Sequence, residues 1–266
     1  MHSRTVQLSF SGLPARICPD GFSASGHILE IGGAEQSHVD LADPTLIFYE
    51  YLRRIGHVVD LVGAPGEPIT AAHLGAGALT LARYIQATRP GSEQVAVDIE
   101  RELPTLVTDH LPLPTGTRLQ VLIDDARAAV PQLAPALGGR APQVIILDIF
   151  SGWDAPEHLR QPSFYRELRE VLADDGLLAV NVGDDPGLSF FRAQARAMLG
   201  VFEHVWCLAD SSMLTGKYPG NLILVGSSIA LDDTTRQRLQ AAGPHPASVL
   251  DSFELTEWLG ATSSGD

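Results

Sequence analysis

Apolar and polar positions alternate in blocks along most of this chain. From residue 69 onward, short apolar runs typical of buried strands alternate with longer stretches whose apolar residues have helical spacing. Such β-α-β-α repetition predicts an α/β fold with a mostly parallel sheet and helices on both faces. The predicted strands are residues 71–74, 94–97, 119–123, 144–147 and 177–182. The predicted helices are residues 79–88, 102–110, 126–137, 163–172 and 188–199.

The two ends of the chain follow other patterns. Strand-like alternation in residues 5–10 and 27–31 predicts a small N-terminal β-hairpin or meander that ends at Gly32-Gly33. We place this region at residues 1–44 and the α/β domain at residues 45–266. Residues 43–45 are expected to begin a helix that continues to Ile55.

Near the C-terminus, apolar runs at residues 202–208 and 222–225 predict an antiparallel pair at the sheet edge. Residues 234–241 and 249–259 predict two terminal helices.

Composition narrows the possible partners. The 266 residues are 45% hydrophobic and 19% charged, which is enough apolar material for a packed core. Lys and Arg number 18 against 32 Asp and Glu, so the net charge is −14. A chain this acidic repels phosphate groups, and we expect neither nucleic acid nor an anionic membrane as a partner. No apolar run reaches the ~20 residues of a membrane helix and no signal peptide is visible, so we expect a cytoplasmic protein with Cys18 and Cys207 as free thiols.

Candidate chemistry follows the predicted strands, because ligands of open parallel sheets bind beyond the carboxyl ends of the strands. Gly75 and Gly77 follow the first strand, where small residues permit a tight turn and a close backbone approach to a ligand. Asp98 ends the second strand, where a carboxylate can accept hydrogen bonds from both ribose hydroxyls. Ordinary helix capping would explain an acidic residue there as well.

Two more carboxylates end the next strands. Asp125 follows the third strand and can accept a hydrogen bond from an adenine amino group, although capping of the next helix explains it almost as well. Asp148 directly follows four apolar residues, a costly place for a charge unless the charge is used. Together these features favour an adenosyl nucleoside site. A dinucleotide site would need a third glycine near Thr80.

Other kinds of site find no support in the sequence. The histidines show no metal-ligand spacing, with His38, His57 and His73 isolated from one another, so we expect no metal site. The sequence contains no Gly-Lys-Ser/Thr phosphate loop and suggests no Ser/His/Asp set.

The order of these motifs resembles the spermidine synthase (polyamine aminopropyltransferase) family, in its short actinobacterial-like branch. The resemblance spans roughly residues 32–225. The matching stretches are residues 36–40, 48–51, 73–77, 97–100, 124–127, 148–151, 164–165 and 172–176. It implies a methyltransferase-like Rossmann domain with an antiparallel edge pair and a small N-terminal β-hairpin domain, and a homodimer.

The resemblance also implies an activity and roles for particular residues. The co-substrate would be decarboxylated S-adenosylmethionine, an adenosyl sulfonium that is not tightly bound, and the acceptor would be a small amine. Gln36 would contact the nucleoside or its thioether, Asp98 the ribose, and Asp125 with Ala126 the adenine. Asp148 would be the catalytic aspartate that orients the attacking amine.

The chain departs from the family pattern around the acceptor. Ala78 replaces an aspartate that grips the aminopropyl nitrogen of the donor, and Phe48 replaces the tyrosine proposed to help deprotonate the amine. Tyr49 stands where the family has histidine. Ser151 replaces a second carboxylate, for which Asp154 is a candidate substitute.

These departures leave two alternatives open. Loss of the aspartate at position 78 also removes the group that would reject a donor carboxylate, which favours an S-adenosylmethionine-dependent methyltransferase. The other alternative is a non-catalytic nucleoside-binding relative.

Overall fold

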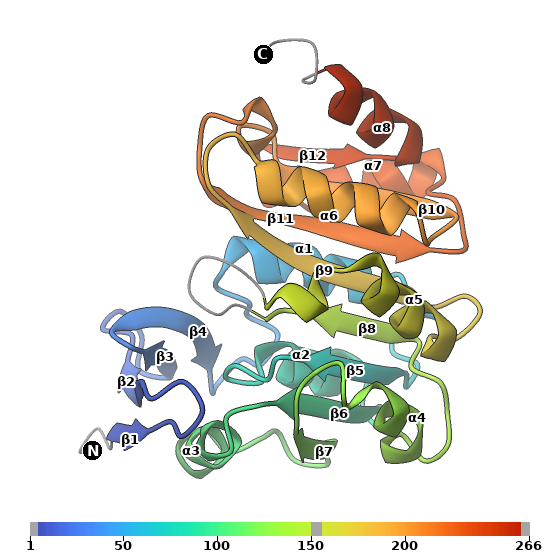
Figure 1. The fold of residues 1–266 in the computed structure, drawn as a ribbon. Helices are drawn as coiled ribbons and strands as arrows, with labels where there is room; N and C mark the ends of the chain where they lie inside the picture. The colour runs from blue at the N-terminus through green and yellow to red at the C-terminus, as the bar shows by residue number, and fades with distance from the viewer. Residues whose placement is uncertain (1–4, 150–155, 262–266) are drawn as a thin grey trace.

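The protein contains two separate sheets in a computed structural model that describes residues 5–149 and 156–261 (Figure 1). The N-terminal sheet has the strands β1 (Thr5–Gln7), β2 (Pro14–Pro19), β3 (Gly26–Ile31) and β4 (Ala34–Asp40). The larger sheet has the strands β5 (Thr70–Leu74), β6 (Glu93–Asp98), β7 (Arg118–Ile123), β8 (Val144–Leu147), β9 (Leu177–Asp184), β10 (His204–Asp210), β11 (Gly220–Ser227) and β12 (Ala247–Leu250).

The larger sheet confirms the predicted α/β fold. Its strand order is β12-β10-β11-β9-β8-β5-β6-β7, and the five strands from β9 to β7 in this order are parallel. Strand β11 pairs antiparallel with β9 and with β10, as the sequence predicts for these two runs. They do not form the edge, however, because β12 pairs with β10 outside them. The helix predicted from residue 249 therefore begins only after this strand.

Helices cover both faces of this sheet. They are α1 (Glu50–Val59), α2 (Thr80–Thr88), α3 (Glu102–His110), α4 (Leu133–Ala136), α5 (Pro162–Val171), α6 (Ser189–Leu199), α7 (Asp233–Ala242) and α8 (Ser252–Ala261). Buried side chains of α4, α5, α6 and α8 pack on one face, and those of α1, α2 and α7 on the other. Among the described residues, no helix is both long enough and apolar enough to cross a membrane.

Two further predicted helices have different bounds in the structure. The helix expected from residue 45 begins at Glu50, because the Asp43 carboxylate accepts hydrogen bonds from Thr45 N and Oγ1 in a local turn. The helix expected over residues 126–137 is reduced to a 3₁₀ turn, Val130–Gln132, and the short α4. Pro131 and Pro135 account for this, since proline lacks the N–H that a continuous helix needs.

The N-terminal sheet is larger than the predicted hairpin. Gly32 and Gly33 do not end it but form the two-residue turn from β3 into β4, with φ of +62° and +85°. Positive φ at both positions suits the twist of such a hairpin. The polar sequence of β4 and the prolines of β2 concealed these strands. The division into domains at residue 44 stays a prediction.

The N-terminal sheet packs against the end of the larger sheet that carries α2 and α3 (Figure 1). Glu100 is 7% exposed, and its carboxylate accepts hydrogen bonds from Phe10 N at 3.0 Å and Ser11 N at 2.7 Å. On the other side, Thr80 Oγ1 donates to His38 O at 3.0 Å. These contacts place β4 beside the loop that follows β5.

Candidate functional site

The loop between β5 and α2 is held by groups from three parts of the chain. Ala76 N donates to Asp98 Oδ2 at 3.0 Å, at the end of β6. Ala78 N donates to Ser37 Oγ of β4 at 3.2 Å. Strand β8 also continues its pairing here, because Asp148 N donates to Leu74 O at 2.9 Å. The loop therefore lies where three predicted site segments meet.

Gly75 and Gly77 are required by this close packing. Their φ values are +95° and +49°, in the left-handed region that favours glycine. A Cβ atom on Gly75 would lie 2.2 Å from Asp148 O, and one on Gly77 would lie 2.7 Å from Ser37 Oγ. The close approach that these glycines permit is thus to the protein's own groups. A close approach of these glycines to a ligand stays a prediction.

Asp98 is bound to the backbone on both sides of its strand end. Its Oδ1 accepts a hydrogen bond from Glu100 N at 2.8 Å, and its Oδ2 the one from Ala76 N. Burial raises the pKa of Asp98, and these two hydrogen bonds oppose the shift without cancelling it. A carboxylate has about four acceptor sites, so two remain for a ligand.

Asp125 makes the capping contacts that the sequence analysis gave as the alternative to adenine binding. Its Oδ1 accepts hydrogen bonds from Arg127 N at 2.9 Å and Ala128 N at 3.1 Å. Its Oδ2 lies 2.7 Å from His158 Nε2. Partial burial alone would raise the pKa of Asp125, but the bonds from His158 and the backbone outweigh it and lower the pKa. Ala126 is 5% exposed and packs in the core beneath.

Asp148 has two partners that the sequence analysis missed. Asn181 Nδ2 of β9 donates to its Oδ1 at 2.8 Å, and the Tyr51 hydroxyl of α1 lies 3.4 Å from its Oδ2. Burial raises the pKa of Asp148, and these two hydrogen bonds lower it only in part. A signal for Asn181 was present, since it is the one polar residue in the apolar run 177–182. For Tyr51 the helical spacing of aromatic residues indicates core packing, although the residue lies in the matching stretch 48–51.

The remaining predicted residues on β4 and α1 lie at the protein surface or near it. Gln36 is exposed at a β-bulge, where the register shifts from Ser37 opposite Leu29 to Glu35 opposite Glu30. The Tyr49 hydroxyl donates to Glu35 Oε2 at 3.0 Å, and burial raises the pKa of Tyr49. Among the described residues, no hydrogen bond links either side chain to Asp98 or Asp125. Ser151 and Asp154 lie outside the described residues.

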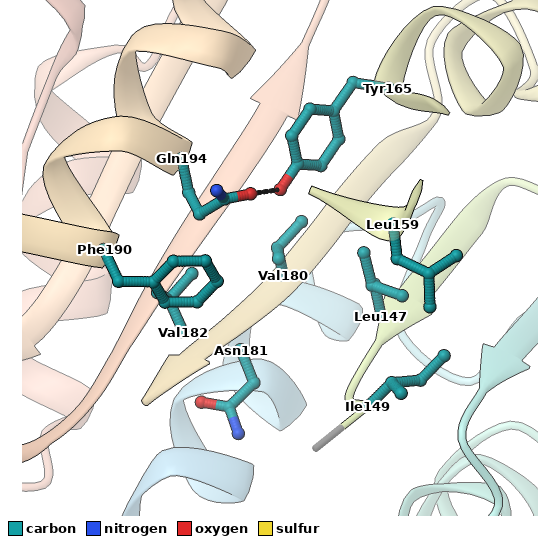
Figure 2. Close-up of a pocket in the computed structure, with 9 residues that line it drawn as sticks. All are labelled: Leu147, Ile149, Leu159, Tyr165, Val180, Asn181, Val182, Phe190 and Gln194. Carbon is teal, nitrogen blue, oxygen red and sulfur yellow. Dashed lines mark hydrogen bonds between the residues drawn. The ribbon is translucent and has the colours of Figure 1, made fainter. Parts of the chain in front are cut away.

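A small pocket lies at the carboxyl ends of β8 and β9 (Figure 2). The Tyr165 hydroxyl donates to Gln194 Oε1 at 2.6 Å in its wall, as the dashed line in Figure 2 marks. Its volume of about 20 Å³ has room for about one water, so it is not an adenosine site. Its lining residues are Leu147, Ile149, Leu159, Tyr165, Val180, Asn181, Val182, Phe190 and Gln194.

Metal-binding geometry is not seen in the described part of the chain. No group of three or more His, Cys, Asp or Glu side chains there is arranged to hold an ion.

Known proteins resemble this chain in sequence and in fold. A polyamine aminopropyltransferase of Neisseria meningitidis, from serogroup A and serogroup B strains, is 27% identical over 187 residues, or 69% of this chain and 68% of that protein. The crystal structure of a probable spermidine synthase from Corynebacterium glutamicum covers 100% of this chain and 95% of its own, with a TM-score of 0.86 and 28% identity. These comparisons confirm that the chain resembles the spermidine synthase family. No family model matches the sequence.

More distant structures share the fold alone. A spermidine synthase in complex with the transition-state analogue AdoDATO is 16% identical, with a TM-score of 0.55 over 85% of this chain and 72% of its own. Human methyltransferase-like protein 13 in complex with SAH is 17% identical, with a TM-score of 0.56 over 79% of this chain and 90% of its own. The fold is therefore methyltransferase-like. The similarity to polyamine aminopropyltransferase and to a probable spermidine synthase supports a transferase enzyme.

We predict that Gly75→Ala destabilises the protein more than Gly33→Ala does. Both glycines have positive φ, so both variants incur backbone strain of about 1–3 kcal/mol. Only at Gly75 does the new methyl group meet another atom, because no atom lies within 4 Å of a Cβ at Gly33. Urea unfolding measures the difference. Equal losses of stability would contradict the close approach of Gly75 to Asp148.

We also predict that Asp148→Asn and Asp125→Asn change stability at pH 7 in opposite directions. The raised pKa of Asp148 means that wild type loses stability as pH rises from about 3.9, the ordinary aspartate value, through the raised one. Asp148→Asn removes this loss and stabilises the protein. The lowered pKa of Asp125 means that its carboxylate contributes stability at neutral pH, which Asp125→Asn removes.

Unfolding free energies at pH 7 and pH 4 test this pair of variants. Both differences from wild type should shrink at the lower pH, where wild-type Asp148 gains protons and the contribution of Asp125 declines. A loss of stability in both variants at pH 7 would contradict the assignment for Asp148.

Proposed function

We propose that the protein transfers an aminopropyl group from decarboxylated S-adenosylmethionine to an amine and releases 5′-methylthioadenosine. One observation carries this proposal, namely that Asp98 and Asp148 flank the same Gly75 loop. Asp98 accepts a hydrogen bond from Ala76 N, and a Cβ atom on Gly75 would lie 2.2 Å from Asp148 O. The residue proposed to bind the nucleoside and the residue proposed to orient the acceptor would thus adjoin one loop at the carboxyl edge of the parallel strands.

The nucleoside half of the proposal rests on the acceptor sites that remain on Asp98. The ribose hydroxyls would donate to its oxygens beside the bonds from the backbone. Asp125 and the backbone at Ala126 would contact the adenine, and His158 would have to share or release Asp125 Oδ2, which lies 2.7 Å from its Nε2. Gln36 would reach the thioether side from the exposed bulge of β4.

The transfer itself needs positioning more than acid–base chemistry. The neutral nitrogen of the acceptor forms a bond to the aminopropyl carbon while the bond from that carbon to sulfur breaks. The electron pair passes to sulfur, which becomes a neutral thioether, and the nitrogen becomes positively charged and then releases a proton. Asp148 would accept a hydrogen bond from the attacking nitrogen and orient its lone pair. Tyr49, Ser151 and Asp154 are the candidates for holding the rest of the amine.

Methyl transfer from S-adenosylmethionine is a second candidate function, which the surroundings of Ala78 favour. The Ala78 side chain is 1% exposed, and its N–H is bound to Ser37. No carboxylate at this position repels the carboxylate of S-adenosylmethionine. The two donors, each offered with a panel of amines and followed by mass spectrometry, separate the two functions, because the product gains either an aminopropyl or a methyl group. The cytoplasmic location and the homodimer stay predictions.

We predict that the protein binds methylthioadenosine and that Asp98→Asn weakens this binding about 10- to 100-fold. The reason is that hydrogen bonds to a charged group contribute about 1.5–3 kcal/mol. Asp184→Asn is the matched control. Asp184 also ends a strand and accepts two backbone hydrogen bonds, from Asp185 N and Phe191 N, at a different strand end.

Isothermal calorimetry measures both variants beside wild type. Asp184→Asn should leave the affinity unchanged even if it lowers the melting temperature. Absence of binding to wild type at millimolar ligand, or equal weakening in both variants, would contradict the nucleoside site.

A further inference from the structure

Each oxygen of Asp148 has a neutral hydrogen-bond donor, and the two donors come from different elements. Asn181 Nδ2 reaches Oδ1 from the neighbouring strand β9, at 2.8 Å. The Tyr51 hydroxyl reaches Oδ2 from α1, at 3.4 Å. Two donors on different elements fix the plane of a carboxylate more firmly than one, and each oxygen keeps an acceptor site for another partner.

The packing of α1 directs the hydroxyl of Tyr51 to Asp148. Tyr49, at the N-cap, has an extended backbone with φ of −75° and ψ of 132°. Its ring stacks on Tyr51, with centroids 6.3 Å apart and planes 22° apart. The ring of Phe48 stacks on His38, with a centroid distance of 4.7 Å, and meets the ring of Tyr49 edge-on at 5.5 Å. Phenylalanine at position 48 has no hydroxyl, whereas Tyr51, three residues later, has one that reaches Asp148.

We propose that Tyr51 is a positioning residue, whose hydroxyl holds the Asp148 carboxylate ionised and oriented toward the amine acceptor. The proposal rests on the aminopropyl or other amine-directed transfer proposed above. In this role Tyr51 acts through Asp148 and not on the reacting atoms. Each oxygen of Asp148 keeps an acceptor site for the amine.

The electrostatics of the pair favour this direction of hydrogen bonding. Burial, followed by the charge of Asp148, raises the pKa of Tyr51 far above neutral pH, so its phenol stays protonated and donates. Donation to a carboxylate favours the ionised form, against the burial that raises the pKa of Asp148. Among the described residues, Tyr51 of α1 and the uncharged Asn181 of β9 are the groups that interact with this carboxylate. Tyr49 adjoins Tyr51, and its own hydroxyl is bound to Glu35.

The test compares Tyr51→Phe with Tyr84→Phe. Tyr84, on the helix α2, is a matched control. Its side chain is half-buried, and its hydroxyl also donates to an aspartate, Asp60 Oδ2, at 2.7 Å. The first measurement is the pKa of Asp148 in protein labelled with ¹³C-aspartate, where the Asp148→Asn variant identifies the carboxyl resonance. The second is the pH dependence of kcat and of KM for the amine.

We expect Tyr51→Phe to raise the pKa of Asp148 by about one unit, the equivalent of one hydrogen bond to a charged group. The acid limb of the rate profile should move to higher pH by the same amount, and kcat should fall about 10- to 100-fold. Methylthioadenosine affinity should stay unchanged. Tyr84→Phe should show none of these changes, although both variants lose some thermal stability.

An unchanged Asp148 pKa in Tyr51→Phe would overturn the proposal, as would the same shift in both variants. The titration needs no turnover, so it decides the role of Tyr51 separately from the proposed function. If wild type transferred no group to any amine, the proposed function would fail while the titration still showed whether Tyr51 holds Asp148.

Discussion

The loop after β5 is the constraint on which the candidate site depends. It can follow its path only because Gly75 has no side chain, since a Cβ atom there would collide with the carbonyl oxygen of Asp148. The same loop is tied to Asp98 through Ala76 N and to β4 through the Ser37 hydroxyl. The conformation of this loop therefore fixes the ends of β6 and β8 and the N-terminal sheet relative to one another. Any ligand at this edge meets a surface that these contacts have already fixed.

The aspartates at this edge differ in chemistry although their places in the sequence are alike. Asp148 directly follows the strand β8, and Asp125 lies two residues after the strand β7. Asp125 is half-exposed and accepts hydrogen bonds from His158 and two backbone groups, which stabilise its charge. Among the described residues, Asp148 has two neutral side-chain donors, and burial works against its charge. The ionised carboxylate of Asp148 lowers the stability of the protein, and a binding or catalytic role explains why it is present at this edge.

The sequence predicted the regular part of the fold and missed the contacts that depend on three-dimensional packing. Apolar runs located the five parallel strands closely, because buried parallel strands are apolar on both faces. The prediction of one helix over residues 126–137 was wrong, because two prolines in this segment shorten the helix. Polar residues concealed β4 and the bulge that exposes Gln36. The contact between Tyr51 and Asp148 could not be derived, since the two residues lie 97 positions apart in the sequence and the spacing of Tyr51 indicates a buried helix face.

A crystal structure of the protein with methylthioadenosine tests the central claim most directly. The account predicts that the ligand lies against the Gly75 loop, with its ribose hydroxyls within hydrogen-bond distance of Asp98 and its sulfur on the side of Asp148. A ligand bound at another surface, or well-diffracting crystals that bind none at millimolar concentration, would contradict it.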